Sequence, residues 1–525
     1  MSSTTLVTNR AMLRHKCEWD ETHIERPERL EVILDCLDNN EVCKGFVIVE
    51  GAPADMEDIF LVHDKEYVEE IKNQCEKPID EIEGYCTRNE DIYLNSFTYE
   101  CAVLSAGSCV QALTSVLGKS GQNAFAAVRP PGHHASQNAG CGFCIFNNVA
   151  ICAKKALEMG CKKVLIVDWD VHAGQGTQYC IAEDDRIRLI SSHRYEEGKF
   201  WPQLPESGIC NKYKNTINLP LNEVGHGDSE YVYFFNGLII PVIHDLQPDL
   251  ILVSCGFDAA LGDPEGEMKI TPAGYGYMMG QLAALDIPLC VLLEGGYFID
   301  SVKESFKFCM EALGTKKPPL PLNLGRPSEV FVGQVLRAMN VHQDEFPTIK
   351  LLLGVLRTIR EWQKKPVITL PEQEYCGERE FSTPPYPTRN LYPPRPENVE
   401  EYFRTEVKEL VRLYVKQRQD GVELAMKSIF IQTDENSIGL KVDNGKVRHW
   451  QASENDLVVI YFLILQHVRG KLVDCQVQLG SEKSRILFPV SLKRFVDLLQ
   501  PNLNISGAST ISSPLLMLAS ELDCL

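Results

Sequence analysis

Short, fully apolar runs alternate with helix-like stretches from residue 9 to residue 316, and no other feature of the sequence constrains the fold as much. The apolar runs include AFAAV, VLIV, LILV and LCVLL, and amphipathic stretches such as NVAICAKKALEMG lie between them. Strands that are apolar at every position are buried on both faces, which is typical of a parallel sheet covered by helices. The sequence therefore predicts an α/β fold with a doubly wound parallel sheet, in which ligands bind beyond the carboxyl ends of the strands.

Two proline-rich stretches, KKPPLPLNLGRP and STPPYPTRNLYPPRPEN, separate this region from the remaining chain. Clusters of proline and glycine mark boundaries and linkers between folded segments. We expect a main domain over residues 9–316, a helical extension over 317–364, a proline-rich linker over 365–398 and a smaller C-terminal α+β domain over 399–525. This last region shows no pattern of side chains that indicates catalysis, and we regard it as a candidate surface for a protein partner.

The chain of 525 residues carries 52 basic and 72 acidic side chains and a net charge of −20. This charge argues against direct binding to nucleic acid or to membranes and suits a cationic substrate, although a solvated acidic surface explains it equally well. The 19 cysteines are scattered, and MSSTTLVTNR contains no apolar leader. These features predict reduced thiols and a cytoplasmic protein.

Four of the predicted strands end in residues whose side chains can do chemistry. Alternate residues of an extended chain point the same way, so the side chains that follow VLIV are expected to project together. Burying such charges is costly unless another group pairs with them. The four sets are His133 and His134 in RPPGHHA, Asp168, Asp170 and His172 in VDWDVH, Asp258 in CGFDAALGDPEGE, and Tyr297 in LEGGYF.

Asp170, His172 and Asp258 form a set of three nitrogen and oxygen ligands. Catalytic zinc sites keep three protein ligands and one open position for water or substrate. A mixed set of this kind also suits iron or manganese, so ligand type alone does not fix the metal.

The remaining side chains suit acid–base work beside such a metal. His133 and His134 are placed to accept a proton from water and to protonate a leaving amine. Tyr297 is a candidate donor to a developing oxyanion, and Asp168 is a candidate carboxylate for orienting a histidine. Taken together, the four sets predict metal-assisted hydrolysis of an amide.

Six runs of the sequence resemble the signature motifs of the class II zinc-dependent histone deacetylases: RPPGHHA, GFCIFNN, VDWDVHAGQGTQ, SSHRYEEGKFWP, SCGFDAALGDPEGE and LEGGY. The resemblance covers residues 9–316 in the family's order and spacing. It implies an arginase-like α/β fold, a zinc-dependent deacetylase and, in addition to the cytoplasm, a nuclear location. By motif position it implies zinc ligands at Asp170, His172 and Asp258, an acid–base pair at His133 and His134 with Asp168 behind it, a carbonyl-polarising Tyr297, acyl-tunnel walls at Phe143 and Trp201, and a potassium ion near Asp168, Asp170, His172, Ser191 and Ser192.

Two positions depart from the family pattern. Ala173 stands where the family has a further histidine, which is not a zinc ligand. Gln175 stands where the family has Asn or Asp to support the second active-site histidine. Because Gln is one methylene longer, we expect His134 to be tilted or to have an altered pKa. An enzyme is the main expectation, and a weakly active or non-catalytic scaffold that binds acetyl-lysine is an alternative.

Three stretches, IERPERL, KFWPQLPES and GDPEGE, resemble the polyamine-deacetylase branch of class IIb. The resemblance implies that Glu265 guards the mouth of the tunnel and favours a cationic amine, with Glu90 and Asp91 adding negative potential. That branch has a constricting insertion before IERPERL, which CEWDETHIERPERL lacks. A wider mouth suits acetyl-lysine in histones or other proteins, which is the main substrate expected. An N-acetylated polyamine is the alternative.

Overall fold

The protein is described by a computed structural model in which the chain forms two compact units. One unit comprises Met1–Asp228, Gln247–Pro321 and Glu372–Val411, and the other comprises Ser229–Leu246, Leu322–Pro371 and Arg412–Leu525. The described residues are 4–39, 45–118, 123–319, 321–322, 327–350, 352–353, 375–377, 383–419, 422–433, 438–442, 457–468, 471–480 and 486–491. Much of the predicted extension and linker, and residues 492–525 of the predicted C-terminal domain, lie outside these ranges.

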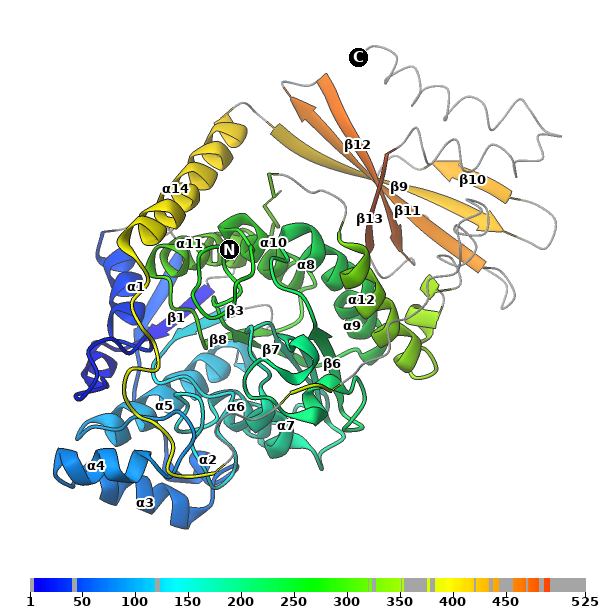
Figure 1. Ribbon diagram of the computed structural model, residues 1–525. Coiled ribbons are helices and arrows are strands. Elements are labelled where there is room, and N and C mark those ends of the chain that lie inside the picture. Colours follow the sequence, from blue (N-terminus) through cyan, green and yellow to red (C-terminus); the bar gives the residue numbers. More distant parts are fainter. Residues whose placement is uncertain are drawn as a thin grey trace. The chain divides into compact units, whose positions relative to one another are not determined.

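The first unit is built on an eight-stranded sheet in the order β2-β1-β3-β8-β7-β4-β5-β6 (Figure 1). Every neighbouring pair in this sheet is parallel, which confirms the predicted α/β fold class. All residues of the central strands are buried, as their unbroken apolar runs predict. The strands are β1 Thr4–Thr8, β2 Phe46–Glu50, β3 Asn123–Ala127, β4 Val164–Asp168, β5 Ile187–Arg194, β6 Thr216–Leu221, β7 Leu250–Cys255 and β8 Leu289–Leu293.

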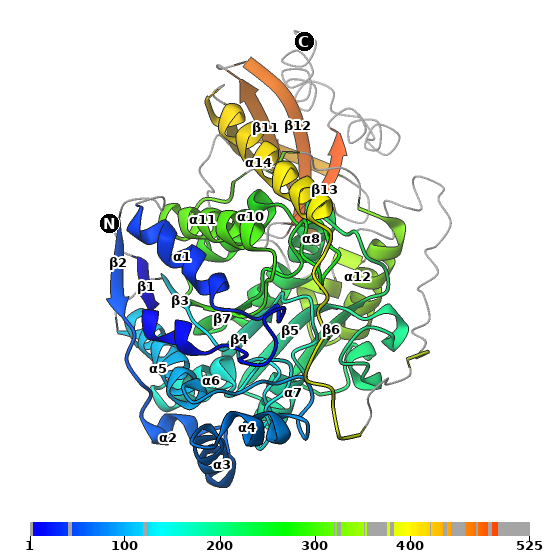
Figure 2. The ribbon, with the colours of Figure 1, turned by 60° about the vertical axis from the view of Figure 1, so that its left-hand side comes forward.

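Helices cover both faces of this sheet (Figures 1 and 2). The pair α10 and α11 lies on one face together with α1, and α5 and α6 lie on the other. Over both units, the described helices are α1 Glu28–Asp38, α2 Met56–Ile59, α3 Lys65–Cys75, α4 Ile79–Cys86, α5 Thr98–Leu117, α6 Asn148–Glu158, α7 Gln175–Ile181, α8 Asp228–Phe234, α9 Ile240–Leu246, α10 Pro272–Ala283, α11 Ile299–Thr315, α12 Glu329–His342 and α14 Glu397–Gln419, with short helical segments η1 Arg10–Arg14, η2 Glu196–Gly198, η3 Pro205–Gly208 and η4 Phe235–Ile239.

Helix α5 is long and apolar enough, by length and composition, to cross a membrane. Its most apolar window is nevertheless 67% buried within the protein, and the helix contacts β1, β3, β8 and α6. This burial is typical of a core helix that supports a parallel sheet, and it explains why the helix is apolar around most of its circumference.

The second unit contains a five-stranded antiparallel sheet in the order β10-β9-β11-β12-β13. Its strands are β9 Val422–Thr433, β10 Ile438–Val442, β11 Leu457–Val468, β12 Lys471–Gly480 and β13 Ile486–Ser491. The same unit holds η4, α9 and α12, and α12 packs on η4.

A buried ion cluster joins the start of α1 to the end of β8 in the first unit. Arg129 makes two hydrogen bonds to the carboxylate of Glu25, at 2.8 and 2.6 Å, and Arg29 makes a third at 2.7 Å. Arg29 also donates to the carbonyl of Gly296 at 2.6 Å and to the carbonyl of Glu294. All three charged side chains are fully buried. The cluster therefore fixes the backbone that leads to Tyr297.

We expect Glu25→Gln to destabilise the protein by about 3–5 kcal/mol, because it removes the only negative charge that the two buried guanidinium groups contact within the described residues. Chemical denaturation followed by intrinsic fluorescence measures the change. The exposed Glu31→Gln on α1 is the matched control and is expected to shift stability by no more than about 0.5 kcal/mol. Equal effects of the two substitutions would show that the cluster does not support the fold.

Candidate active site

The chemically active residues follow four strands that are neighbours in the sheet. Strands β3, β8, β7 and β4 lie side by side, and each is followed by one of the predicted sets. Because the strands are parallel, their carboxyl ends meet at one edge of the sheet. The topology therefore brings together the sets around His133, Asp168, Asp258 and Tyr297, which are far apart in the sequence.

Asp170, His172 and Asp258 converge on one point at this edge. The Nδ1 atom of His172 lies 3.1 Å from Asp170 Oδ1 and 3.3 Å from Asp258 Oδ2. Backbone N–H groups hold the other carboxylate oxygens, since Gly295 donates to Asp170 Oδ2 at 2.9 Å and Val171 donates to Asp258 Oδ1 at 2.8 Å. A Cβ atom at position 295 would lie 2.1 Å from Asp258 Oδ2, so only glycine allows this approach.

This arrangement fits a divalent metal ion. The ligand atoms of the three residues all lie within 4.8 Å of one another, and all three side chains are buried. Ligands about 2.0–2.1 Å from a tetrahedral zinc ion lie roughly 3.3 Å apart, close to the two distances from His172. Burial and the nearby Asp170 raise the pKa of Asp258 to about 8, the direction expected where two buried carboxylates lie close together.

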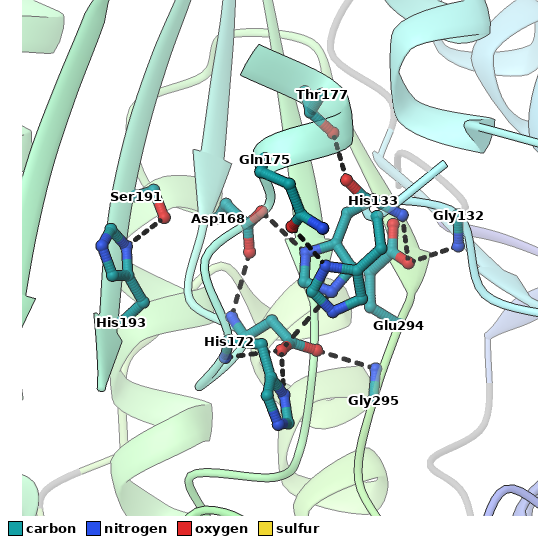
Figure 3. A network of polar contacts seen from close by, with 12 residues as sticks. Gly132, His133, Asp168, His172, Gln175, Thr177, Ser191, His193, Glu294 and Gly295 are labelled. Atoms are coloured by element: carbon teal, nitrogen blue, oxygen red, sulfur yellow. Dashed lines mark hydrogen bonds and ion pairs between the residues drawn. The ribbon is translucent and has the colours of Figure 1, made fainter. Parts of the chain in front are cut away.

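His133 is paired with two carboxylates (Figure 3). Its Nδ1 atom lies 3.1 Å from Asp168 Oδ2, and its Nε2 atom lies 3.5 Å from Asp170 Oδ1. Burial alone lowers the pKa of His133, but Asp170 and Asp168 outweigh it and raise the pKa to about 10. The backbone N–H groups of Gly132 and His133 donate to Glu294 Oε2 at 2.7 and 3.2 Å, which fixes the turn that carries both histidines.

His134 stands in a different environment. Its Nδ1 atom lies 2.7 Å from Gln175 Oε1, so the longer amide at this position reaches the ring. An amide oxygen only accepts, which requires Nδ1 to carry the proton and leaves Nε2 as an acceptor. The pKa of His134 is held well below its usual value, first by burial and then by the neighbouring His133 and His172 rings.

A pocket of about 320 Å3 opens above these groups. His134, His172 and Tyr297 line it, and so do all five residues predicted to contact substrate. Phe143 packs edge-on against Tyr297 at 5.7 Å, and Trp201 packs edge-on against His134 at 4.7 Å. The full lining is Glu90, Asp91, His134, Gly142, Phe143, His172, Lys199, Phe200, Trp201, Gln203, Glu265, Tyr297, Tyr386, Pro387, Leu391 and Tyr392.

Three carboxylates stand in the walls of this pocket. Glu90 accepts a hydrogen bond from Trp201 Nε1 at 3.1 Å, and Asp91 accepts one from the hydroxyl of Tyr392. Burial raises the pKa of Asp91 to about 7, and the nearby Glu265 and Glu90 add to this rise. Burial also raises the pKa of Glu265. The three acids therefore form a crowded, partly desolvated negative rim.

The residues predicted for a potassium ion lie on β4, on the loop after it and on β5. Asp168 is paired in register with Ser191. The hydroxyl of Ser191 lies 2.8 Å from His193 Nδ1 (Figure 3). Among the described residues, the buried hydroxyl of Ser192 has no hydrogen-bond partner.

Several residues of the site were not predicted. Glu294, directly before the two glycines of LEGGY, supports the histidine turn. Phe200 stacks on His172 with ring centroids 5.2 Å apart. Tyr386 and Tyr392 line the pocket although they come from a stretch predicted to be a linker. The only signal for this last pair is the placement of aromatic residues among the prolines of YPTRNLYPPRP.

Comparison with known proteins agrees with the geometry. Residues 23–313 match the family described as the histone deacetylase domain. The zebrafish (Danio rerio) protein named polyamine deacetylase HDAC10 is 37% identical over 360 residues, which cover 67% of this chain and 53% of that protein. The human (Homo sapiens) HDAC10 is 40% identical over 327 residues, covering 60% and 49%, and histone deacetylase 18 of Arabidopsis thaliana is 37% identical over 320 residues, covering 59% and 47%.

The chain thus spans about half the length of the curated relatives it matches. Among solved structures, the HDA15 HD domain superposes with a TM-score of 0.61 at 32% sequence identity, over 68% of this chain and 100% of that one. The resemblance to the histone deacetylases, with the polyamine-deacetylase branch among the similar proteins, is confirmed. From its matched domain, its fold and the shared sequence, the chain belongs to the histone deacetylase family.

Proposed function

We propose that this protein is a zinc-dependent deacetylase that hydrolyses the acetamide of N6-acetyl-lysine in histones or other proteins. The observation that carries the proposal is the convergence of Asp170, His172 and Asp258 at the base of a narrow pocket that His134 and Tyr297 also line. A metal site, a neutral base and a hydroxyl donor around one cavity are the parts that amide hydrolysis needs.

Asp170, His172 and Asp258 would hold the zinc ion, since they supply three ligands of the types zinc prefers. When bound there, zinc supplies a Lewis acid that polarises the acetyl carbonyl and acidifies the attacking water. The protein's own contribution is to orient these ligands. The N–H groups of Gly295 and Val171 fix the two carboxylates, and these in turn fix the His172 ring.

The two histidines have different tasks: His134 carries out both proton transfers, and His133 keeps a fixed positive charge. His134 faces the pocket with a lowered pKa, so its Nε2 atom is ready to take a proton from water. His133 stays protonated beside Asp168 and stabilises the negative charge that gathers at the base of the site. The proton held on His134 Nε2 then passes to the leaving amine as the amide C–N bond breaks, which gives acetate and a free amine. Gln175 acts as a positioning residue that keeps the required tautomer of His134.

Tyr297 completes the reaction site. Burial raises the pKa of Tyr297 well above its usual value, so its hydroxyl stays protonated and can donate a hydrogen bond to the oxyanion that forms from the acetyl carbonyl. Phe143 and Trp201 flank the pocket and would exclude water from the alkyl chain of the substrate. We further propose a potassium ion beside Asp168, supported by the buried hydroxyl of Ser192, which has no hydrogen-bond partner in the part of the chain that the structure describes.

An N-acetylated polyamine is a second candidate substrate. The observation that favours it is the rim of Glu90, Asp91 and Glu265, three carboxylates that line one pocket. A negative, partly desolvated rim attracts the second ammonium group of an acetylated polyamine more strongly than it attracts a neutral peptide.

Removing the tyrosine hydroxyl tests the proposed reaction. We expect Tyr297→Phe to lower kcat on an acetyl-lysine peptide by about 10²–10³ while zinc binding is unchanged, because the lost hydrogen bond forms only to the oxyanion. Turnover and zinc stoichiometry are measured on the same samples. The exposed Tyr402→Phe on α14 is the control and should keep full activity. If the wild type and Tyr297→Phe were equally inert with zinc bound, the chain would instead be a non-catalytic scaffold that binds acetyl-lysine.

The substrate preference can be tested at Glu265. If the rim selects cations, Glu265→Leu is expected to lower kcat/KM for N-acetylspermidine at least tenfold and to leave that for a neutral acetyl-lysine peptide within about threefold. Both substrates are assayed side by side with the wild type, and Glu267→Leu on the exposed neighbouring position is the control. A wild-type preference for the peptide that the substitution does not alter would leave Glu265 without a role in selection.

The rim also predicts a pH dependence. Since the pKa of Asp91 is raised to about 7, this carboxyl is mostly neutral at pH 6 and mostly ionised at pH 8. The ratio of kcat/KM for N-acetylspermidine to that for a neutral peptide should therefore rise across this interval. Taking the ratio cancels the titration of groups that both reactions share. Asp91→Asn should flatten the rise, and a rise that persists in this variant would assign it to another group.

A further inference from the structure

A segment outside the matched family domain forms part of the pocket wall. Residues 386–392, which we call the strap, begin more than seventy residues after the end of the match at residue 313. The strap belongs to the same compact unit as the site. In Figures 1 and 2 it is part of the yellow coil that leads into α14. Neither the catalytic chemistry nor the acidic rim described above explains why the chain returns here.

Hydrogen bonds attach the strap along its length to the C-terminal part of helix α4 and to the loop that precedes α1. The N–H of Tyr386 donates to the carbonyl of Thr87 at 2.7 Å, and Trp19 Nε1 donates to the carbonyl of Thr388 at 3.0 Å. At the middle of the strap, Arg389 makes two hydrogen bonds of 2.6 Å to Glu83.

The attachment continues at Asn390, whose N–H donates to Asp20 Oδ2 at 2.7 Å. Pro387 lies within the strap, and Pro385 and Pro393 flank it, so the backbone has little freedom to lose when it is held in place. These hydrogen bonds and prolines thus hold the strap in a fixed position at the wall of the pocket.

Tyr392 is the strap residue with ring contacts to a predicted tunnel residue. Its ring packs edge-on against Phe143 at 5.7 Å and against His23 at 5.3 Å, and its hydroxyl donates to Asp91. Tyr392 and Tyr297 both line the main pocket and also a second cavity of about 390 Å3. Tyr392 thus contributes to the walls of both cavities, so a smaller residue at this position would widen them.

Tyr386, Pro387 and Leu391 extend this wall, so that four of the sixteen residues lining the pocket come from the strap. Bulky, anchored side chains at a pocket wall exclude groups that are attached close to the acetylated chain. They do not exclude the unbranched alkyl chain that carries the acetylated nitrogen, because this chain is only one methylene group wide. Discrimination of this steric kind commonly amounts to about 10–200-fold in rate.

We propose that the strap is a steric specificity element, with Tyr392 as its central residue, that admits acetylated amines on slender chains and rejects those with bulky groups beside the acetylated chain. The proposal rests on the deacetylase function proposed above and narrows its substrates. A free acetylated amine, or an acetyl-lysine flanked by small residues, fits the pocket. An acetyl-lysine flanked by large side chains is excluded, because those side chains would clash with the strap.

Two peptides of equal charge test the steric selection. One has glycine and the other has tryptophan on both sides of a single acetyl-lysine, and each is assayed with the full chain. We expect the wild type to prefer the glycine peptide at least tenfold in kcat/KM. Tyr392→Ala should reduce this preference to threefold or less, mainly by improving the tryptophan peptide. Tyr392→Phe, which keeps the ring but loses the hydrogen bond to Asp91, should retain the wild-type preference, and Tyr402→Ala is the control for tyrosine removal elsewhere.

A binding measurement separates this proposal from the proposed function. Two alkyl hydroxamates with the same chain, one ending in a methyl group and one in a bulky aromatic cap, are titrated into zinc-loaded wild type, Tyr392→Ala and Leu391→Ala. We expect the wild type to bind the capped compound at least tenfold more weakly than the methyl-terminated compound. In both variants, the difference between the two affinities should be smaller. If turnover is absent but the ratio narrows, the strap selects ligands and the deacetylase function is wrong. If the ratio of affinities, or of kcat/KM, is the same in folded wild type and variants, the strap has no role in specificity.

Discussion

Two buried carboxylates that share one imidazole are the constraint on which the rest of the site depends. Asp170 and Asp258 lie at the ends of adjacent strands with no access to water, and both contact His172 Nδ1. Such a group of charges is unfavourable in a low dielectric unless a cation joins it or fixed dipoles surround it. The loop geometry supplies those dipoles, since Gly295 and Val171 each direct an N–H at one carboxylate. A divalent metal ion is the group that best completes the balance of charge.

The two adjacent histidines show how position alone gives one residue type two roles. His133 points back toward Asp168 and Asp170, which raise its pKa to about 10 against the effect of burial. His134 is buried beside two other imidazoles and an amide, and its pKa is lowered. Groups whose surroundings push their pKa values apart can hold different protonation states at the same pH, one charged and the other neutral. Gln175 matters here because its oxygen reaches His134 at 2.7 Å despite the extra methylene, so the family's supporting contact persists with a different side chain.

Sequence patterns predicted those parts of the fold and site whose determinants are local. Fully apolar runs predicted buried parallel strands, and the polar residues directly after VLIV were predicted to lie together at the edge of the sheet, as they do. Contacts over long sequence separation left no such pattern. Glu25 and Arg129 are more than one hundred residues apart in the sequence. Nothing in IERPERL indicates that Glu25, the first of its two glutamates, is fully buried between two guanidinium groups. Tyr392 lies three hundred residues from Asp91, and its proline-rich surroundings are equally typical of an exposed linker.

The position of the strap suggests that two properties of the protein, its reaction and its range of substrates, depend on different segments of the chain. The proposed metal ligands, the two histidines and Tyr297 all lie within residues 23–313, and in the proposed reaction these residues determine which bond is cleaved. One wall of the pocket comes from residues 386–392, which lie outside that domain and are held by Thr87, Glu83 and Asp20. A chain can therefore keep the family's chemistry while a later segment changes which substrates reach it. Because a pocket wall selects by excluding groups and not by binding them, such a change needs no alteration at the metal.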